Sequence, residues 1–307
     1  MVFADRLQKE IERTGSCLVA GCDPVLDSLP GWLHQQVAEY ATTDKEYIAR
    51  ALELFTDCFL NAVQDVVAAI KPNIAFFEQY GIDGLVVFES LCRRAKERGL
   101  QVIADAKRGD IGSTAMAYSR AFLGGATVKG RNAAAFHCDA LTVNPFLGFD
   151  TLEPFVEACQ ENGKGLFILV QTSNPGAKEI QSVNQDGRSV SERVASWIAE
   201  QSDRLRGACG WSGLGAVVGA PYPDEARRLR EVMQEAIFLI PGLGAQGGQA
   251  SESIAGFGSQ NGRRGGGLVN ASRGLLIGDS SSPESFCKLI TSNIERFNSQ
   301  ISQALHD

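Results

Sequence analysis

The stretch QVIADAK, residues 101–107, places a short apolar run directly before an aspartate and a lysine. Apolar runs that do not alternate with polar residues are typical of parallel strands whose two faces are both buried. The sequence therefore predicts a parallel sheet of eight strands, because seven further runs of this kind occur along the chain: CLVAGCD (17–23), VVAAIKPN (66–73), ALTVNP (140–145), GLFILVQT (165–172), GLGAVVGA (213–220), AIFLIPG (236–242) and GLVNASRG (267–274).

Segments with helical periodicity lie between these runs. Thr43 and Ser189 each stand three residues before a glutamate, which is the spacing of a capping box, and apolar residues then recur on one helical face. Pro283 marks another helix start, because proline is favoured in the first turn. Eight β–α units in 307 residues match the size of a (β/α)₈ barrel.

The predicted fold is α/β, a single (β/α)₈ TIM barrel formed by residues 1–307 as one domain. An extra N-terminal helix with Phe3, Leu7 and Ile11 on one face precedes the first strand and is expected to cover the bottom of the barrel. A doubly wound parallel sheet uses the same alternation and is the alternative. Extended βα loops are expected at residues 24–43, 173–188 and the glycine-rich 241–266.

Composition narrows the class of protein. The net charge is −7 and the chain has no basic run, which argues against binding to nucleic acid. No apolar run approaches the roughly 18 residues of a membrane span, and the charged N-terminus is unlike a signal peptide. Eight cysteines without a C-x-x-C pair and three histidines show no metal-ligand spacing. We expect a soluble, cytoplasmic protein with reduced thiols.

Polar residues gather at the carboxyl ends of the predicted strands, where the active site of a barrel lies. Asp105 and Lys107 are two residues apart and so face the same side of their strand, and Asp110 follows one short turn later. Two carboxylates beside an ammonium group can keep a lysine charged and positioned to donate a proton. A salt bridge that ties the strand end to its helix explains this spacing equally well. The other strand ends carry Asp23, Lys71, Asn144, Thr172, Ser173, Gly242 and Arg273.

A glycine-rich stretch after the seventh predicted strand indicates a phosphate site. PGLGAQGG, residues 241–248, contains a formal G-x-G-x-x-G pattern, but it lies late in the chain and no acidic residue follows at the spacing of a dinucleotide-binding fold, about 20 positions on. Loops after the last two strands of a barrel often bind phosphate through backbone N–H groups. Arg273 is then placed to bind a phosphate dianion in a bidentate manner.

One block of the sequence is similar to a family signature. DAKRGDIGST, residues 105–114, resembles the D-x-K-x-x-D-I-x-x-T signature of the orotidine 5′-phosphate decarboxylases, and the long loops resemble the longer-chain, type 2 branch of that family. The 251–266 segment matches no family block. The other matching blocks follow in family order: AGCDP (20–24), IKPN (70–73), LTVNPFLGFD (141–150), QTSNPGA (171–177), IPGLGAQGG (240–248) and NASRG (270–274).

The resemblance implies a role for each residue that matches a family motif. The catalytic charge network would consist of Lys71, Asp105, Lys107 and Asp110. Asp110, Ile111 and Thr114 would reach into the site of a partner subunit, which implies a homodimer with shared sites. The remaining roles concern the substrate: Asp23, Lys71 and Asn73 for the ribose, Ser173 and Pro241 for the pyrimidine, and Gln246 and Arg273 for the phosphate.

The implied reaction is the decarboxylation of orotidine 5′-phosphate to uridine 5′-phosphate, the last step of de novo pyrimidine nucleotide synthesis. Lys107 would stabilise a carbanion at C6 and then protonate it. The family uses no metal, flavin or pyridoxal cofactor, so fixed charges would take the place of an electron sink. The alternatives are a metal-dependent decarboxylase of a sugar phosphate on a related barrel, a non-catalytic barrel that binds a phosphate ligand, and a nicotinamide-dependent oxidoreductase.

Overall fold

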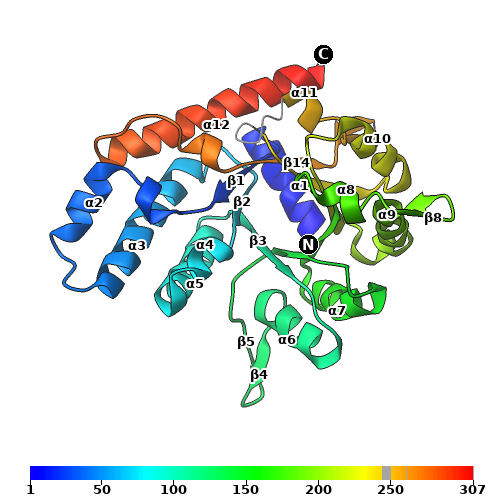
Figure 1. The fold of residues 1–307 in the computed structure, drawn as a ribbon, viewed down its shortest axis with the longest axis horizontal. Coiled ribbons are helices and arrows are strands. Elements are labelled where there is room, and N and C mark those ends of the chain that lie inside the picture. Colours follow the sequence, from blue (N-terminus) through cyan, green and yellow to red (C-terminus); the bar gives the residue numbers. More distant parts are fainter. Residues whose placement is uncertain (244–249, 261, 307) are drawn as a thin grey trace.

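A computed structural model describes residues 1–243, 250–260 and 262–306. Eight parallel strands close into a barrel in the order β1-β14-β11-β10-β7-β6-β3-β2, with helices around it (Figure 1). Closure excludes the doubly wound sheet and confirms the predicted TIM barrel. The barrel strands are β1 (Leu18–Cys22), β2 (Ala69–Pro72), β3 (Gln101–Arg108), β6 (Ala140–Val143), β7 (Gly165–Gln171), β10 (Ser212–Val218), β11 (Ala236–Pro241) and β14 (Gly267–Ala271).

Helices follow the barrel strands, and an extra helix precedes the first strand, as the sequence predicts. The last helix packs along α3 and crosses the top of the view in Figure 1. Within the described ranges, no helix combines the length and the apolar character needed to cross a lipid bilayer. The helices are α1 (Phe3–Thr14), α2 (Gly31–Ala38), α3 (Asp44–Val63), α4 (Ala75–Glu78), α5 (Gly81–Glu97), α6 (Gly112–Phe122), α7 (Glu153–Asn162), α8 (Ala177–Ile180), α9 (Val190–Gln201), α10 (Pro223–Val232), α11 (Ala250–Ser253) and α12 (Pro283–His306).

The capping residues expected from the sequence begin two of these helices. Ser189 accepts a hydrogen bond from the Glu192 amide while the Glu192 carboxylate accepts one from the Ser189 amide, so α9 has a complete capping box. Thr43 caps α3 by accepting from the Glu46 amide, but the Glu46 carboxylate accepts hydrogen bonds from Thr42 instead of Thr43. The expected starts of both helices are therefore confirmed, with half a capping box at α3.

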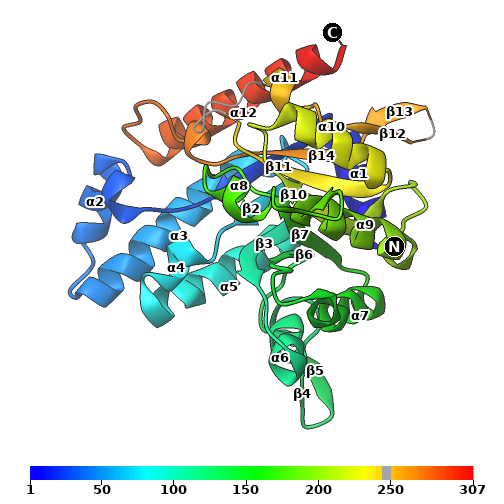
Figure 2. The same cartoon turned by 45° about the vertical axis from the view of Figure 1, so that its right-hand side comes forward.

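The extended βα loops contain short elements of their own. The loop after β1 holds α2, the loop after β7 holds α8 and a hairpin, and the loop after β11 holds α11 and a hairpin. A further hairpin between α6 and β6, which the sequence pattern does not predict, projects outward beyond α6 (Figure 2). The hairpin strands are β4 (Ala126–Val128) with β5 (Arg131–Ala133), β8 (Asn184–Gln185) with β9 (Arg188–Ser189), and β12 (Gly258–Gln260) with β13 (Arg263–Gly265).

The N-terminal helix α1 covers the bottom of the barrel. Phe3 is fully buried, and its ring meets that of Phe167 edge-on with centroids 6.0 Å apart. Gly165 permits this approach, since a Cβ at that position would lie 2.3 Å from the Phe3 ring. The buried carboxylate of Asp139 lies 3.2 Å from the Arg6 guanidinium and also pairs with Lys96 of α5 and with Lys164, which precedes β7. Apolar packing and charge thus both attach α1 to the strands.

A buried arginine holds the segment that follows the glycine-rich loop. The Arg230 guanidinium donates hydrogen bonds to the carbonyl oxygens of Gly256 and Gly266, both at 2.8 Å, and it lies 3.7 Å from the centroid of the Phe238 ring. A Cβ at position 256 would come within 2.9 Å of that ring, and Gly266 has a φ of +71°. Two glycines of the 241–266 segment therefore allow close packing around Arg230.

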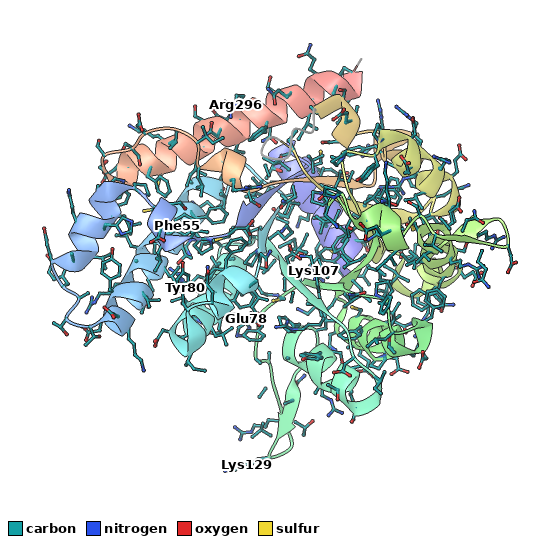
Figure 3. All side chains as sticks on the ribbon, in the orientation of Figure 1. Phe55, Glu78, Tyr80, Lys107, Lys129 and Arg296 are labelled. Carbon is teal, nitrogen blue, oxygen red and sulfur yellow. The ribbon has the colours of Figure 1, made fainter. Side chains whose placement is uncertain are left out.

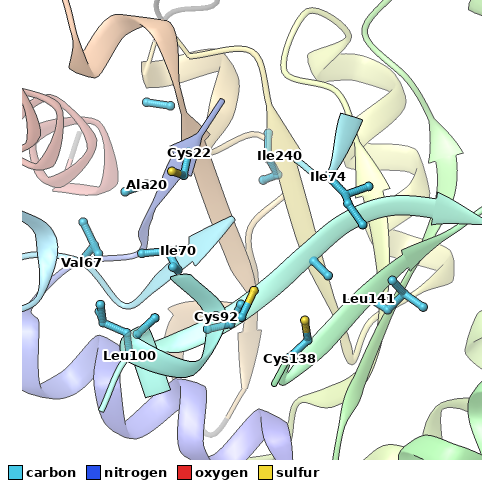
Figure 4. Close-up of a cluster of buried hydrophobic side chains, with 14 of the residues drawn as sticks. Ala20, Cys22, Val67, Ile70, Ile74, Cys92, Leu100, Cys138, Leu141 and Ile240 are labelled. Carbon is cyan, nitrogen blue, oxygen red and sulfur yellow. The ribbon is translucent and has the colours of Figure 1, made fainter. Parts of the chain in front are cut away.

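The cysteines are free thiols, as expected, and five of the eight are buried. Figure 4 shows Cys22, Cys92 and Cys138 within a cluster of apolar side chains that includes Ile70. Burial raises the pKa of the Cys22 and Cys92 thiols well above the ordinary value of 9.0. Thiols of this kind stay protonated at neutral pH and act as small apolar residues of the core.

Candidate active site

A cavity of about 660 Å³ opens at the carboxyl ends of the barrel strands. Lys107 lies near the middle of the barrel in the view of Figure 3. Gln246, predicted to bind phosphate, lies outside the described residues. The other predicted residues that line the cavity end or follow six different strands, so closure of the barrel brings them together. They are Asp23, Lys71, Asn73, Asp105, Lys107, Ser173, Pro241 and Arg273.

Lys71, Asp105 and Lys107 form a charge cluster in this cavity. The Lys71 ammonium lies 2.7 Å from Oδ2 of Asp105, and the Lys107 ammonium lies 2.5 Å from Oδ1 of the same carboxylate. The side chains of Lys71 and Asp105 are 6% and 10% exposed, whereas that of Lys107 is 48% exposed. One carboxylate therefore fixes two ammonium groups, of which Lys107 is the accessible one. Both salt bridges of Asp105 join residues of β2 and β3, and neither ties the strand end to the helix that follows it.

Thr142 shapes the end of β3 around the charge cluster. Its hydroxyl oxygen accepts hydrogen bonds from the backbone amides of Ala106 and Lys107, at 3.0 and 2.9 Å, and its hydroxyl donates to Asp105 at 3.0 Å. The pairing of β3 with β6 shifts register here, and Lys107 adopts a left-handed φ of +47°. Such a conformation is unfavourable for a lysine, so the hydroxyl of Thr142 helps to hold a strained backbone in place.

Burial and neighbouring charges shift the pKa values of Asp105 and Lys71 in opposite directions. Burial disfavours the ionised forms of both Asp105 and Lys71. The two ammonium groups outweigh this effect and hold the pKa of Asp105 well below its ordinary value of 3.8. The Asp105 and Asp23 carboxylates likewise raise the pKa of Lys71 above its ordinary value of 10.5. Asp105 and Lys71 are therefore both charged at neutral pH.

Asp105→Asn is expected to destabilise the protein by about 3 kcal/mol at neutral pH, because it leaves the buried Lys71 ammonium without its closest carboxylate. The pKa of Asp105 is lower in the folded than in the unfolded chain, so its stabilising effect is present above about pH 4 and disappears as the pH falls through the folded-state pKa. Urea unfolding of both proteins at neutral and acidic pH measures the difference. A difference that does not shrink in acid would contradict an electrostatic origin.

The turn after β3 directs three predicted site residues away from this cavity. Asp110, Ile111 and Thr114 do not line the cavity of their own chain, and Ile111 is 63% exposed. The Asp110 carboxylate accepts a hydrogen bond from the Ile111 amide at 2.8 Å and forms no salt bridge with any other described residue. Within one chain, the structure does not join Asp110 to the charge cluster.

Comparison with known proteins identifies the family. The sequence model of the orotidine 5′-phosphate decarboxylase / HUMPS family matches residues 48–284. The chain belongs to this family. An orotidine 5′-phosphate decarboxylase of Rhodopirellula baltica is 42% identical over 277 residues, which cover 90% of this chain and 89% of the relative. The corresponding protein of Clostridium tetani is 36% identical over 308 residues, with 99% of each chain covered.

The fold of the orotidine 5′-phosphate decarboxylase family agrees with this assignment. The structure of Leishmania donovani OMP decarboxylase has a TM-score of 0.71 to this chain at 29% sequence identity, and the match covers 97% of this chain and 100% of that one. The resemblance inferred from the motifs is thus confirmed. The roles of individual residues remain predictions, which the geometry of the cavity supports.

The loop after β7 of this family member is positioned by contacts that no sequence motif indicates. The backbone amide of Thr172 donates to Oε1 of Gln181 at 2.9 Å, and the Gln181 side-chain amide donates to Oγ1 of Thr172 at 2.8 Å. Oγ1 of Thr172 also lies 2.7 Å from Oδ1 of Asn174. Ser173 lies between these two anchored residues, so its place in the cavity wall is fixed by a glutamine in the loop after β7.

Two further polar residues of the cavity, Asn270 and Ser272, belong to the NASRG block, from which only Arg273 was predicted. The signal for them was present in the sequence. Leu268 faces the interior of the barrel, and a strand alternates its faces, so the residues two and four positions later point the same way. Counting inward positions along each strand places both residues and Thr142 in the barrel interior, but it does not predict their contacts.

Proposed function

We propose that the protein is a carbon–carbon lyase that decarboxylates orotidine 5′-phosphate to uridine 5′-phosphate without a cofactor. The charge cluster at the carboxyl ends of β2 and β3 carries this proposal, because it holds one accessible ammonium group rigidly inside a nucleotide-sized cavity. Membership of the orotidine 5′-phosphate decarboxylase family supports it. We further propose that residues 1–307 act as one domain and that the enzyme works in the cytoplasm.

The chemistry requires a fixed positive charge at one carbon atom. Loss of CO₂ breaks the bond between C6 and the carboxylate and leaves the electron pair on C6, in the plane of the ring, where the π system cannot delocalise it. A preorganised ammonium group stabilises this charge without reorganising at the moment of reaction. Lys107 would fill this role, and it would then transfer a proton from Nζ to C6 to form the C6–H bond of the product.

The other members of the charge cluster would keep Lys107 in position. The buried Lys71 favours the ionised form of Asp105, and Asp105 in turn holds the Lys107 ammonium at 2.5 Å. The hydroxyl of Thr142 fixes the backbone of Lys107 at the same time. Because the ammonium is already oriented before substrate binds, this arrangement favours the transition state more than the ground state.

Substrate binding would use the rest of the cavity. We assign Arg273 and Gln246 to the phosphate, Ser173 and Pro241 to the pyrimidine, and Asp23, Lys71 and Asn73 to the ribose. The phosphate is remote from C6, and binding energy released there can be used to close the surrounding loops over the site.

We propose that the enzyme is a homodimer that completes each site with residues of the other subunit. Asp110, Ile111 and Thr114 lie outside the cavity of their own chain, and the exposed Ile111 side chain is of the apolar kind that an interface buries. In the dimer, Asp110 and Thr114 would enter the partner's cavity, where Asp110 would add a second carboxylate to the charge cluster.

An absorbance assay that follows the loss of orotidine 5′-phosphate with no added cofactor tests the proposed reaction. We expect turnover that EDTA does not change. Activity lost on adding EDTA would instead favour a metal-dependent decarboxylase on a related barrel. Nucleotide binding without any turnover would favour a barrel that only binds phosphate ligands.

A further inference from the structure

Asn270 combines deep burial with an unused hydrogen-bonding atom. The residue is 7% exposed, and its side chain lines the cavity that holds the charge cluster. Its Oδ1 atom is buried and has no hydrogen-bond partner among the residues that the structure describes, while its amide nitrogen donates a long bond of 3.4 Å to Ser272. Buried acceptors in proteins are nearly always paired, so a donor is expected there when the site is occupied.

The neighbours of Asn270 locate it within the cavity. In the strand ladder, Asn270 is in register with Pro241 of β11 on one side and with Val19 of β1 on the other. The end of β1 carries Asp23, whose Oδ1 atom is likewise buried without a partner in the described part of the chain. Gly21 of β1 allows the end of β14 to pack closely against it, because a Cβ at position 21 would lie 1.8 Å from Oγ of Ser272. Two unsatisfied acceptors thus lie on adjacent strands of one cavity.

The chemistry of a nucleotide substrate limits what can satisfy these acceptors. The phosphate and the carboxylate of orotidine 5′-phosphate are ionised at neutral pH and offer acceptors only. The remaining donors are the two ribose hydroxyls and the N3–H of the pyrimidine. Under the proposed function, Asn270 lies between Pro241 of β11, which is assigned to the pyrimidine, and β1, whose Asp23 is assigned to the ribose. The second unpaired acceptor is on Asp23, so the β1 side, where the ribose would lie, is the side that needs donors.

We infer that Asn270 is a further substrate-binding residue, whose Oδ1 atom accepts a hydrogen bond from one of the two ribose hydroxyls. This inference rests on the proposed function, because it requires a ribonucleotide in the cavity. It extends the ribose contacts beyond β1 and β2 to the last strand of the barrel. Removal of the acceptor should weaken binding only of ligands that carry the hydroxyl in question.

The experiment measures calorimetrically how uridine 5′-phosphate and its 2′-deoxy and 3′-deoxy analogues bind to wild type and to Asn270→Leu, which has a similar size but no acceptor. We expect the variant to bind uridine 5′-phosphate about tenfold more weakly. It should bind one deoxy analogue as tightly as wild type does, and the other about tenfold more weakly. Asn162→Leu, on α7 and outside the cavity, is the matched control and should change none of these affinities.

The outcomes separate this inference from the proposed function. Equal weakening of all three ligands, or no weakening of any, would overturn the assignment of Asn270 to a hydroxyl even if wild type decarboxylates orotidine 5′-phosphate. A wild type that neither turns over orotidine 5′-phosphate nor binds its product would overturn the proposed function itself. If Asn270→Leu does not fold, as judged by thermal unfolding, Asn270→Ala provides the same comparison.

Discussion

Lys107→Ala is expected to lower kcat for decarboxylation by at least about 10⁴-fold, because it removes both the charge that stabilises the C6 carbanion and the proton that quenches it. Binding of uridine 5′-phosphate should change by no more than about threefold, since the phosphate, ribose and pyrimidine contacts remain. Steady-state kinetics and calorimetry on the same preparation separate the two effects. A variant that retains near-normal turnover would contradict the role of Lys107.

The control for this variant is Lys129→Ala. Lys129 is also a lysine in the left-handed region, with a φ of +50° against +47° for Lys107, but it lies in the exposed turn between β4 and β5 (Figure 3). Its replacement makes the same chemical change on the same kind of backbone, away from the cavity. Full activity of Lys129→Ala would show that the loss at position 107 comes from the ammonium group and its location.

Mixing two inactive proteins, Lys107→Ala and Asp110→Ala, is expected to restore about a quarter of wild-type activity. With random exchange, half of the dimers are hybrids, and each hybrid contains one site with an intact Lys107 from one chain and an intact Asp110 from the other. Its second site carries both substitutions and stays inactive. The measurement is the absorbance assay after the subunits have exchanged and the mixture has been returned to native conditions.

Subunit exchange must be demonstrated independently, for example by a label on one of the two proteins. Each variant alone, taken through the same procedure, gives the baseline. If hybrid dimers form but activity does not recover, each site uses Lys107 and Asp110 of the same chain, and the shared-site proposal fails. The position of Asp110 outside its own cavity is the structural reason to expect recovery.

The sequence predicted the architecture well because it depends on repeated, local patterns. Residues 165–170, for example, are apolar throughout, as expected of a strand in a sheet covered on both faces. The capping residues Thr43 and Ser189 mark helix starts within the chain itself. The same holds for the charge cluster: Asp105 and Lys107 are two residues apart on one strand. Lys71 joins them because parallel strands end on the same side of the barrel.

The hydrogen bonds that shape the site could not be predicted, because they depend on which residues the folded barrel brings together. Thr142 binds the backbone of β3 only because β6 lies beside it, and Gln181 reaches Thr172 only after the loop folds back. No pattern along the chain shows that Asn270 is buried with a free acceptor. The hairpin of β4 and β5 also went unpredicted, because its exposed residues follow no hydrophobic periodicity.

The left-handed backbone at position 107 has a consequence for engineering. A glycine there would relieve about 1 kcal/mol of conformational cost, but it would also remove the ammonium group that pairs with the Asp105 carboxylate, so backbone strain and salt bridge act in opposite directions at this position. Directed evolution of this barrel should hold residue 107 constant and seek stability at exposed helix positions instead.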